Sequence, residues 1–218
     1  MRAIWIIVVS AWLTGTWLGC GPSGPADGGA AYSHSDGEPA FEDWRKEAPL
    51  PAGWPAPSRP GRIVVKQYPP VRRAVVRAAP GEDDDDMFGP LFDHIQRRDV
   101  PMTAPVVTTY KAAGHPLQPM SMAFLYPSTT RGQPGVAKAV RVEDVGPVTV
   151  VSVGVKGAYT QENLQKAADR LTTWLAGRSD QWQAAGPLRR LAYNSPFNFW
   201  WSKYAEVQIP IKRANPGE

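Results

Sequence analysis

The chain has 218 residues, of which 43% are hydrophobic and 20% charged, a composition typical of a globular protein with room for one domain and additional segments. The net charge is only +4 and the basic residues form no stripe with interleaved aromatic residues, which argues against a nucleic-acid-binding protein. Cys20 is the only cysteine, which excludes an intrachain disulfide and a cysteine-based metal site, and the three histidines lack the spacing of a zinc motif.

Residues 1–19 are predicted to be a signal peptide. Arg2 precedes an apolar run that ends at Leu18 and is shorter than the ~20 residues that a transmembrane helix needs. Leu18-Gly19-Cys20 resembles a bacterial lipobox, although Trp17 stands where leucine is usual. We therefore expect lipidation at Cys20 and export to the bacterial cell envelope, facing the periplasm or the surface, because two acyl chains anchor stably in a membrane. The alternative is an ordinary signal peptide or an uncleaved anchor with an incidental cysteine.

Residues 20–60 are interpreted as the lipidated N-terminus and a disordered tether. They contain Gly21-Pro22-Ser23-Gly24-Pro25 and a second proline-rich stretch at 49–57. A segment of this composition is not expected to bury enough apolar surface to offset the entropy lost on ordering. The folded domain is therefore expected to span residues 61–218.

The first half of that domain is predicted to have the order strand, strand, helix, strand, strand. Short β-branched and alternating stretches indicate the strands, and an apolar face of Phe88, Leu91, Phe92 and Ile95 indicates the helix. The predicted ranges are 62–68, 71–78, 87–98, 103–110 and 120–126.

The same order recurs in the second half, at 139–144, 147–155, a helix between Thr160 and Gly177, 188–193 and 204–211. The two halves also echo each other in sequence. Val65…Tyr68-Pro69-Pro70-Val71 resembles Val142…Val145-Gly146-Pro147-Val148, and Met102-Thr103-Ala104-Pro105 resembles Tyr193-Asn194-Ser195-Pro196. Two such ββαββ halves would pack as a pseudo-twofold pair, and ligand sites often lie in the crevice between repeats.

These residues resemble the SOUL haem-binding protein family over about residues 62–212. The most specific stretches are Val100-Pro101-Met102-Thr103-Ala104-Pro105-Val106, residues 142–175, and Asn194-Ser195-Pro196-Phe197 leading to Glu206-Val207. The resemblance implies an α+β fold in which duplicated ββαββ halves form a distorted β-barrel-like sheet carrying two helices. It also implies haem or another tetrapyrrole as the ligand. Bacterial effector-binding domains, which bind apolar and often cationic drugs, have a similar fold.

The family has no invariant haem-ligating residue to carry over. Some members are thought to use a histidine near the first helix, where this chain has the acidic run 82–86. His94 falls inside the predicted helix and His115 in a hairpin loop, and we expect neither to bind iron. Haem binding would then be mainly apolar, and no metal site is predicted.

Candidate ligand-lining residues fall on the first helix, on the strands and in an aromatic loop before the last strand, because methionine and flat rings suit a large planar ligand. They are Phe88, Leu91, Phe92, Met102, Met122, Phe197, Phe199 and Trp200. The candidates to meet the haem propionates are Arg97, Arg98 and Lys203. The alternative is that most of the apolar candidates are core residues and that the aromatic loop binds a protein partner.

Glu206 is the one acid in a strand of alternating apolar residues, which makes it the candidate to meet a cationic ligand of the effector-binding type. The chain has no Gly-x-Ser-x-Gly elbow and no phosphate-binding loop, so we predict no catalytic residue and no enzyme. Three hypotheses remain open. The first is a membrane-anchored haem- or tetrapyrrole-binding lipoprotein, the second an effector-type domain for a small lipophilic cation, and the third an envelope protein-interaction module.

Overall fold

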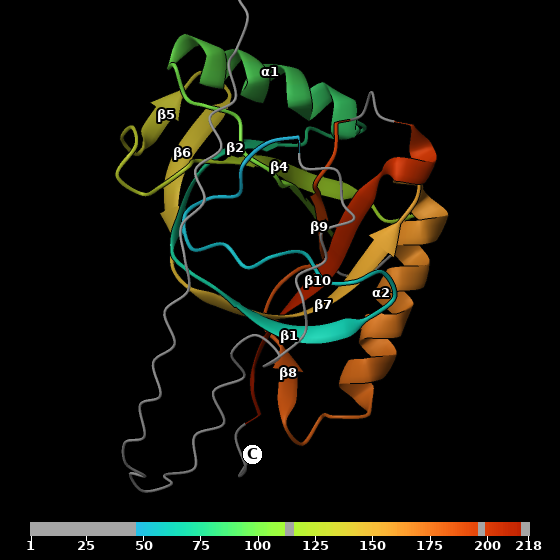
Figure 1. The fold of residues 1–218 in the computed structure, drawn as a ribbon. Helices are drawn as coiled ribbons and strands as arrows, with labels where there is room; N and C mark the ends of the chain where they lie inside the picture. The colour runs from blue at the N-terminus through green and yellow to red at the C-terminus, as the bar shows by residue number, and fades with distance from the viewer. Residues whose placement is uncertain (1–46, 112–115, 196–198, 215–218) are drawn as a thin grey trace, which may run out of the picture. The chain divides into compact units, whose positions relative to one another are not determined.

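The computed structural model describes residues 47–111, 116–195 and 199–214, which form two α-helices, one 3-10 helix and ten strands (Figure 1). The helices are α1 (Asp84–Arg97), α2 (Gln161–Ala176) and η1 (Trp200–Ser202). The strands are β1 (Ile63–Tyr68), β2 (Val71–Arg77), β3 (Val106–Tyr110), β4 (Pro119–Leu125), β5 (Gly135–Ala137), β6 (Val140–Val145), β7 (Val148–Lys156), β8 (Trp182–Ala184), β9 (Arg189–Ala192) and β10 (Tyr204–Arg213). The predicted order of elements is present, and β5 and β8 are additions to it.

All ten strands belong to one antiparallel sheet. Its order is β1-β7-β10-β9-β3-β4-β2-β6-β5, and β8 pairs with β10 beside this path. The α+β class is therefore confirmed, but the expected barrel-like closure is wrong. Closing a barrel requires hydrogen bonds between the two edge strands. In the described residues the path instead ends at β1 on one side and at the three-residue β5 on the other.

The two helices cover the outer face of the sheet, one over each half (Figure 1). α1 packs on β2, β4 and β6, where Leu91 lies in a core cluster with Val76 and Met122. α2 packs on β7 and β10, where Leu171 lies in a cluster with Val207. Alternate strand residues point to opposite faces, so the residues between these positions form the inner face of the sheet.

The inner face is lined by a third core cluster that is rich in tyrosine. Tyr68 of β1 and Tyr204 of β10 belong to it, together with Tyr193, which follows β9. Its other buried members are Trp54, Val71, Val75, Ala104, Val107, Ala123, Leu125, Val150 and Leu191. The alternation predicted for the last strand is confirmed, because Val207, Ile209 and Ile211 pack with α2 whereas Tyr204 packs on the inner face.

Residues 47–60, which we call the strap, pack on this inner face, whereas their composition predicted a disordered tether. Trp54 is buried with its ring centroid 4.4 Å from that of Tyr68. The amide of Ala104 donates to the carbonyl of Pro49 over 2.9 Å, and that of Ala52 donates to the carbonyl of Pro127 over 2.9 Å. The folded domain therefore includes residues 47–60, which were predicted to lie outside it. A proline-rich backbone is ordered here because the sheet supplies its hydrogen-bond partners and a site for one large ring.

The resemblance between residues 65–71 and 142–148 falls on strands in both halves. One constant offset carries β1 onto β6 and the start of β2 onto the start of β7. The resemblance between residues 102–105 and 193–196 does not fall at matching positions. Met102 and its neighbours precede β3, whereas Tyr193 and Asn194 follow β9, so these stretches occupy different steps of the element order.

The predicted signal peptide, Cys20 and the tether up to residue 46 lie outside the described residues. None of the helices that are described has both the length and the apolar character needed to cross a membrane.

Candidate functional site

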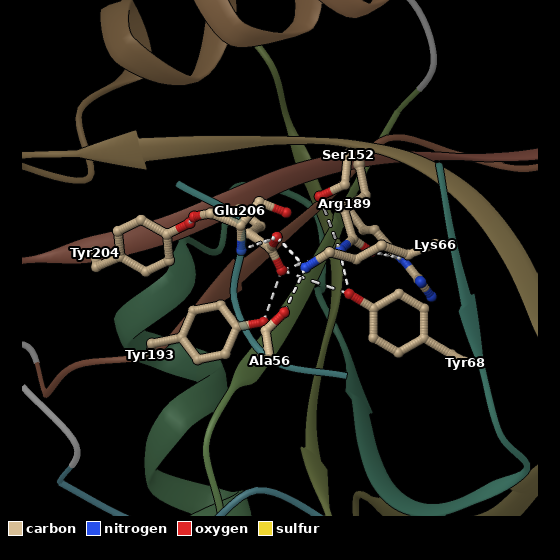
Figure 2. Close-up of polar contacts among 10 residues, drawn as sticks. Ala56, Lys66, Tyr68, Ser152, Arg189, Tyr193, Tyr204 and Glu206 are labelled. Carbon is tan, nitrogen blue, oxygen red and sulfur yellow. Dashed lines mark hydrogen bonds and ion pairs between the residues drawn. The ribbon is translucent and has the colours of Figure 1, made fainter. Parts of the chain in front are cut away.

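A buried polar cluster lies on the inner face of the sheet, centred on the carboxylate of Glu206 (Figure 2). Glu206 is fully buried, and its Oε1 accepts from Lys66 Nζ at 2.5 Å and from the Ser58 amide at 2.9 Å. Its Oε2 accepts from the Tyr193 hydroxyl at 2.7 Å and from the more distant Tyr68 hydroxyl at 3.4 Å. Both carboxylate oxygens are therefore bound, and the charge is paired with that of Lys66.

Strand alternation places these side chains together. Lys66 and Tyr68 are two residues apart on β1, as are Glu206 and Gln208 on β10, so each pair shares the inner face. β7 lies between these two strands and contributes Ser152. Gln208 Nε2 donates to Tyr68 Oη at 2.7 Å and to Ser152 Oγ at 3.2 Å. The three strands thus hold one connected polar network.

Arg189 extends this network toward β9. Its Nε donates to Gln208 Oε1 at 2.9 Å, and its guanidinium carbon lies 5.4 Å from the centroid of the Tyr68 ring. Burial lowers the pKa of Arg189, although nearby Tyr68 opposes this shift. The inner face therefore carries two cationic side chains, Lys66 and Arg189, around one carboxylate.

Electrostatics keep Glu206 ionised and the surrounding tyrosines neutral. Burial raises the pKa of Glu206, but the charge of Lys66 and the hydrogen bonds from Lys66, Ser58 and Tyr193 outweigh burial and lower the pKa below its usual value. Burial, followed by the negative charge of Glu206, raises the pKa of Tyr68, Tyr193 and Tyr204. These hydroxyls are therefore hydrogen-bond donors at neutral pH.

Most of the candidates on and beneath α1 are core residues. Leu91 and Met122 are buried in the cluster between α1 and the sheet, and the half-buried Met102 packs against it. Phe88 is half-buried and contacts Phe92, with the ring centroids 6.0 Å apart and nearly parallel at 15°. Phe92 is the one of these five that is largely exposed, at 42%.

The aromatic loop presents a stacked pair to solvent. The rings of Phe199 and Trp201 lie 4.7 Å apart at an interplanar angle of 10°, and the two residues are 67% and 54% exposed. Phe197 lies outside the described residues, and Trp200 is the first residue of η1. Phe199 is thus exposed, and its stacking partner is Trp201, which was not among the predicted ligand-lining residues.

The three predicted propionate-binding residues have different surroundings. Arg97 is paired with Asp93 at 2.8 Å, and it stands with Arg98 at the C-terminal end of α1. Lys203 Nζ lies 5.3 Å from the Tyr159 ring, which also lies 5.2 Å from the guanidinium of Arg190.

Arg190 connects Lys203 to the opposite end of α1. It forms a partly buried ion pair with Asp84, the first residue of that helix, at 2.6 Å. With a rise of 1.5 Å per residue, the two ends of α1 are about 20 Å apart. Lys203 is therefore connected through Tyr159 and Arg190 to the end of α1 opposite Arg97 and Arg98.

Glu206 was predicted as a site residue from the sequence, but the groups that surround it were not. Lys66 lies 140 residues away in the chain, and the tyrosines resembled ordinary strand residues. A lysine within a β-branched strand was the only available signal. His94 is a buried core histidine that hydrogen-bonds the Tyr126 hydroxyl at 3.1 Å, and His115 lies outside the described residues. Within the part of the chain that is described, no group of three or more histidine, cysteine or acidic residues is arranged to hold a metal ion.

A sequence profile of the SOUL heme-binding protein family matches residues 58–210. No curated protein sequence matches the chain. Among solved structures, the C-terminal domain of EcmrR has a TM-score of 0.55 at 16% identity, and the match covers 71% of this chain and 99% of that one.

Two further solved structures share the fold. EcmrR in its complex with DNA has a TM-score of 0.57 at 16% identity, and the match covers 70% of this chain but only 58% of the longer EcmrR chain. A hydrolase from Listeria innocua has a TM-score of 0.53 at 7% identity, with 70% and 93% of the two chains covered. At these identities the likenesses establish the fold and nothing further.

Proposed function

Because this chain belongs to the SOUL heme-binding protein family, we propose that it binds haem or another tetrapyrrole and that lipid at Cys20 holds it on the bacterial cell envelope. The observation that carries the ligand proposal beyond the family is the exposed, parallel pair of Phe199 and Trp201. Flat rings presented to solvent bind a planar apolar ligand by stacking and by burial of apolar surface.

A tetrapyrrole with carboxylate side chains also requires a cationic partner in the protein. Lys203 follows η1 directly and is the cation of the predicted propionate set that lies nearest the aromatic pair in sequence. An ammonium group binds a carboxylate through charge-assisted hydrogen bonds. In this proposal Phe199 and Trp201 hold the ring system and Lys203 binds one propionate.

We expect the double change of Phe199 and Trp201 to alanine to weaken haemin binding by about 1–3 kcal/mol, since each stacked ring contributes about 0.5–1.5 kcal/mol beyond its buried area. That loss corresponds to a roughly five- to 150-fold rise in the dissociation constant. The melting temperature should stay nearly constant because both rings are exposed. A Soret titration of the full chain measures the binding.

If the double variant binds normally, one single variant tests a second location of the site and another serves as the control. Phe92→Ala removes the exposed aromatic residue of α1, and loss of binding there would move the haem site to that helix. Val136→Ala removes an exposed apolar side chain on β5 and is the control that should change neither property. Unchanged haemin binding in all of them would leave the aromatic pair to a protein partner, the interaction-module alternative.

The anchor is tested separately. Cys20→Ser removes the thiol that the acyl chains would be attached to, so we expect the variant to appear in the soluble fraction and to lose metabolic labelling with palmitate. Retention in the membrane fraction with unchanged electrophoretic mobility would contradict the lipoprotein proposal. The haem proposal does not depend on this result.

The effector-type alternative, a lipophilic cation bound at Glu206, faces a specific obstacle. Lys66 Nζ already neutralises the carboxylate, at 2.5 Å from Glu206 Oε1, and the amide of Ser58 in the strap donates to the same oxygen. A cationic ligand would have to displace both. Binding of tetraphenylphosphonium that disappears in Glu206→Gln would nevertheless favour this alternative over haem.

We also propose that the two halves arose by duplication. Support comes from the strand order β1-β7-β10-β9-β3-β4-β2-β6. Exchanging β1 with β6, β2 with β7, β3 with β9 and β4 with β10 gives the same order read backwards. That is the pattern expected of a pseudo-twofold pair.

A further inference from the structure

The strap covers the buried polar cluster of the inner face, and its contacts are those of a bound peptide. Lys66 Nζ donates to the Ala56 carbonyl at 2.7 Å, and Glu206 accepts from the Ser58 amide at 2.9 Å. The Tyr204 hydroxyl donates to the Ser58 carbonyl. We propose that this face is a binding site for an extended, proline-rich segment carrying a tryptophan, and that the strap is its exchangeable resting occupant.

The recognition is directed at the backbone of the strap. Besides the three contacts above, Ala104 donates to the Pro49 carbonyl and Pro127 accepts from the Ala52 amide, each at 2.9 Å. Five main-chain groups of the strap are therefore bound by the domain. Proline-rich segments suit this mode because they are extended before they bind and lose little entropy.

The side-chain contacts of the strap come from Glu47, whose carboxylate accepts from the Ser195 amide at 2.7 Å, and from the large ring of Trp54. Its ring lies at 52° to that of Tyr68, with 4.4 Å between centroids, and the guanidinium of Arg189 lies over the same Tyr68 ring. Trp54 is the only aromatic residue of the strap and is buried in the inner core cluster. A segment that lacks a large ring at this position would leave a cavity beside Tyr68.

Gly154 on β7 makes the close approach of the strap possible. It is opposite Glu206 in the β7–β10 pairing. A Cβ at this position would lie 2.5 Å from the Arg59 carbonyl oxygen, 2.8 Å from the Ser58 carbonyl oxygen and 2.6 Å from the Tyr204 hydroxyl. The absence of a side chain is therefore what lets a backbone lie against the sheet beside the carboxylate.

Two features favour exchange over permanent attachment. Trp54 Nε1 and Ser58 Oγ are buried without a hydrogen-bond partner among the described residues, and such groups oppose burial. Glu206 also keeps its contacts with Lys66 and Tyr193 when the strap leaves. Opening this face therefore leaves no buried charge without a partner. A competing segment of the same chemistry can thus take over the contacts that the domain makes with the strap.

The test measures binding of a fluorescent peptide with the strap sequence 47–60 to the full chain. In the wild type the attached strap competes at high effective concentration, so weak binding is expected. Trp54→Ala weakens only the attached strap, and we expect it to bind the peptide at least tenfold more tightly than the wild type does. A peptide with alanine in place of tryptophan should bind this variant at least tenfold more weakly.

Gly154→Ala provides the matched contrast. Its Cβ should repel the attached strap and the added peptide alike, so this variant should release the strap yet bind no peptide. Arg59→Ala changes an exposed strap side chain and should behave as the wild type. Peptide binding by Gly154→Ala equal to that of Trp54→Ala would overturn the assignment of the site to this face.

Amide hydrogen exchange of the wild type tests the proposal without any substitution. We expect the Ala52 and Ser58 amides to exchange at least a hundredfold faster than the amides of β7 and β10, because the strap opens locally. Exchange of the strap only at the rate of global unfolding would overturn the proposal. So would a cooperatively folded Trp54→Ala variant that binds no peptide. Haem plays no part in these measurements, so the haem proposal stands or falls separately.

Discussion

Glu206→Gln should destabilise the domain by about 3–5 kcal/mol at neutral pH, the usual cost of removing one partner of a buried ion pair. Lys66 is only 7% exposed, and glutamine leaves its ammonium without a counter-charge. The substitution preserves the shape of the side chain, so the loss reports charge rather than packing. Urea unfolding followed by circular dichroism measures it.

The pH dependence of this difference identifies its cause. The folded-state pKa of Glu206 lies below the usual value of 4.5, so its ionised form contributes stability above about pH 4.5 that is lost as the pH falls through the lowered pKa. The gap between wild type and Glu206→Gln should therefore be full at neutral pH and shrink in acid. A gap that is constant with pH would mean that the variant fails through packing.

The paired change Lys66→Met with Glu206→Leu is the matched control. Replacing a buried ion pair by apolar residues of similar volume is often neutral or stabilising. We expect the double variant to regain most of the stability that either single change removes. If it remains as unstable as Glu206→Gln, the hydrogen bonds to the tyrosines and Ser58, rather than the ion pair, carry the stability of the inner face.

Leu91→Ala should cost about 2–5 kcal/mol of unfolding free energy, because deleting a fully buried leucine leaves a cavity that the core refills only in part. Leu91 lies between α1 and the sheet with no exposed surface. Haemin affinity per folded molecule should be unchanged. Denaturant unfolding and a Soret titration below the transition measure the two quantities.

Phe92→Ala serves as the neighbouring comparison on the same helix. Because Phe92 is 42% exposed, its removal should cost far less stability than that of Leu91. A Leu91→Ala variant with normal stability and lost haemin binding would restore this face of α1 as a ligand pocket. Equal destabilisation by Leu91→Ala and Phe92→Ala would show that the stacking of Phe92 on Phe88 contributes more stability than the exposure of Phe92 suggests.

Local patterns in the sequence determined the helices and most strands. An apolar stripe predicted α2 from the sequence, and it consists of Leu164, Ala167, Ala168, Leu171, Trp174 and Leu175. The first four are the buried face of the helix, and the last two are partly buried. Thr160 caps this helix by accepting from the Asn163 amide at 3.2 Å, as its position before the stripe predicted. Such features are recognisable in sequence because helix periodicity and capping depend on residues only three or four positions apart.

The strap shows where composition misleads. Residues 49–57 contain four prolines and one glycine, which predicts a solvated tether. The segment is nevertheless ordered against the inner face, because Ala104, Lys66, Glu206 and other distant residues bind its backbone. Composition predicts only how much apolar surface a segment can bury by itself. This segment is ordered because it buries its surface against the sheet.

The sequence by itself determined the α+β class, the order of the elements, the family resemblance and the choice of Glu206 as an unusual acid. Only the tertiary structure decided which groups surround that acid, that the sheet stays open, and that Arg97 and Arg98 lie at one end of α1 while Lys203 is linked to the other. The reason is the range of the forces involved. Periodicity and caps act between near neighbours in the chain, whereas the Lys66–Glu206 pair joins strands 140 residues apart and exists only once the sheet has paired.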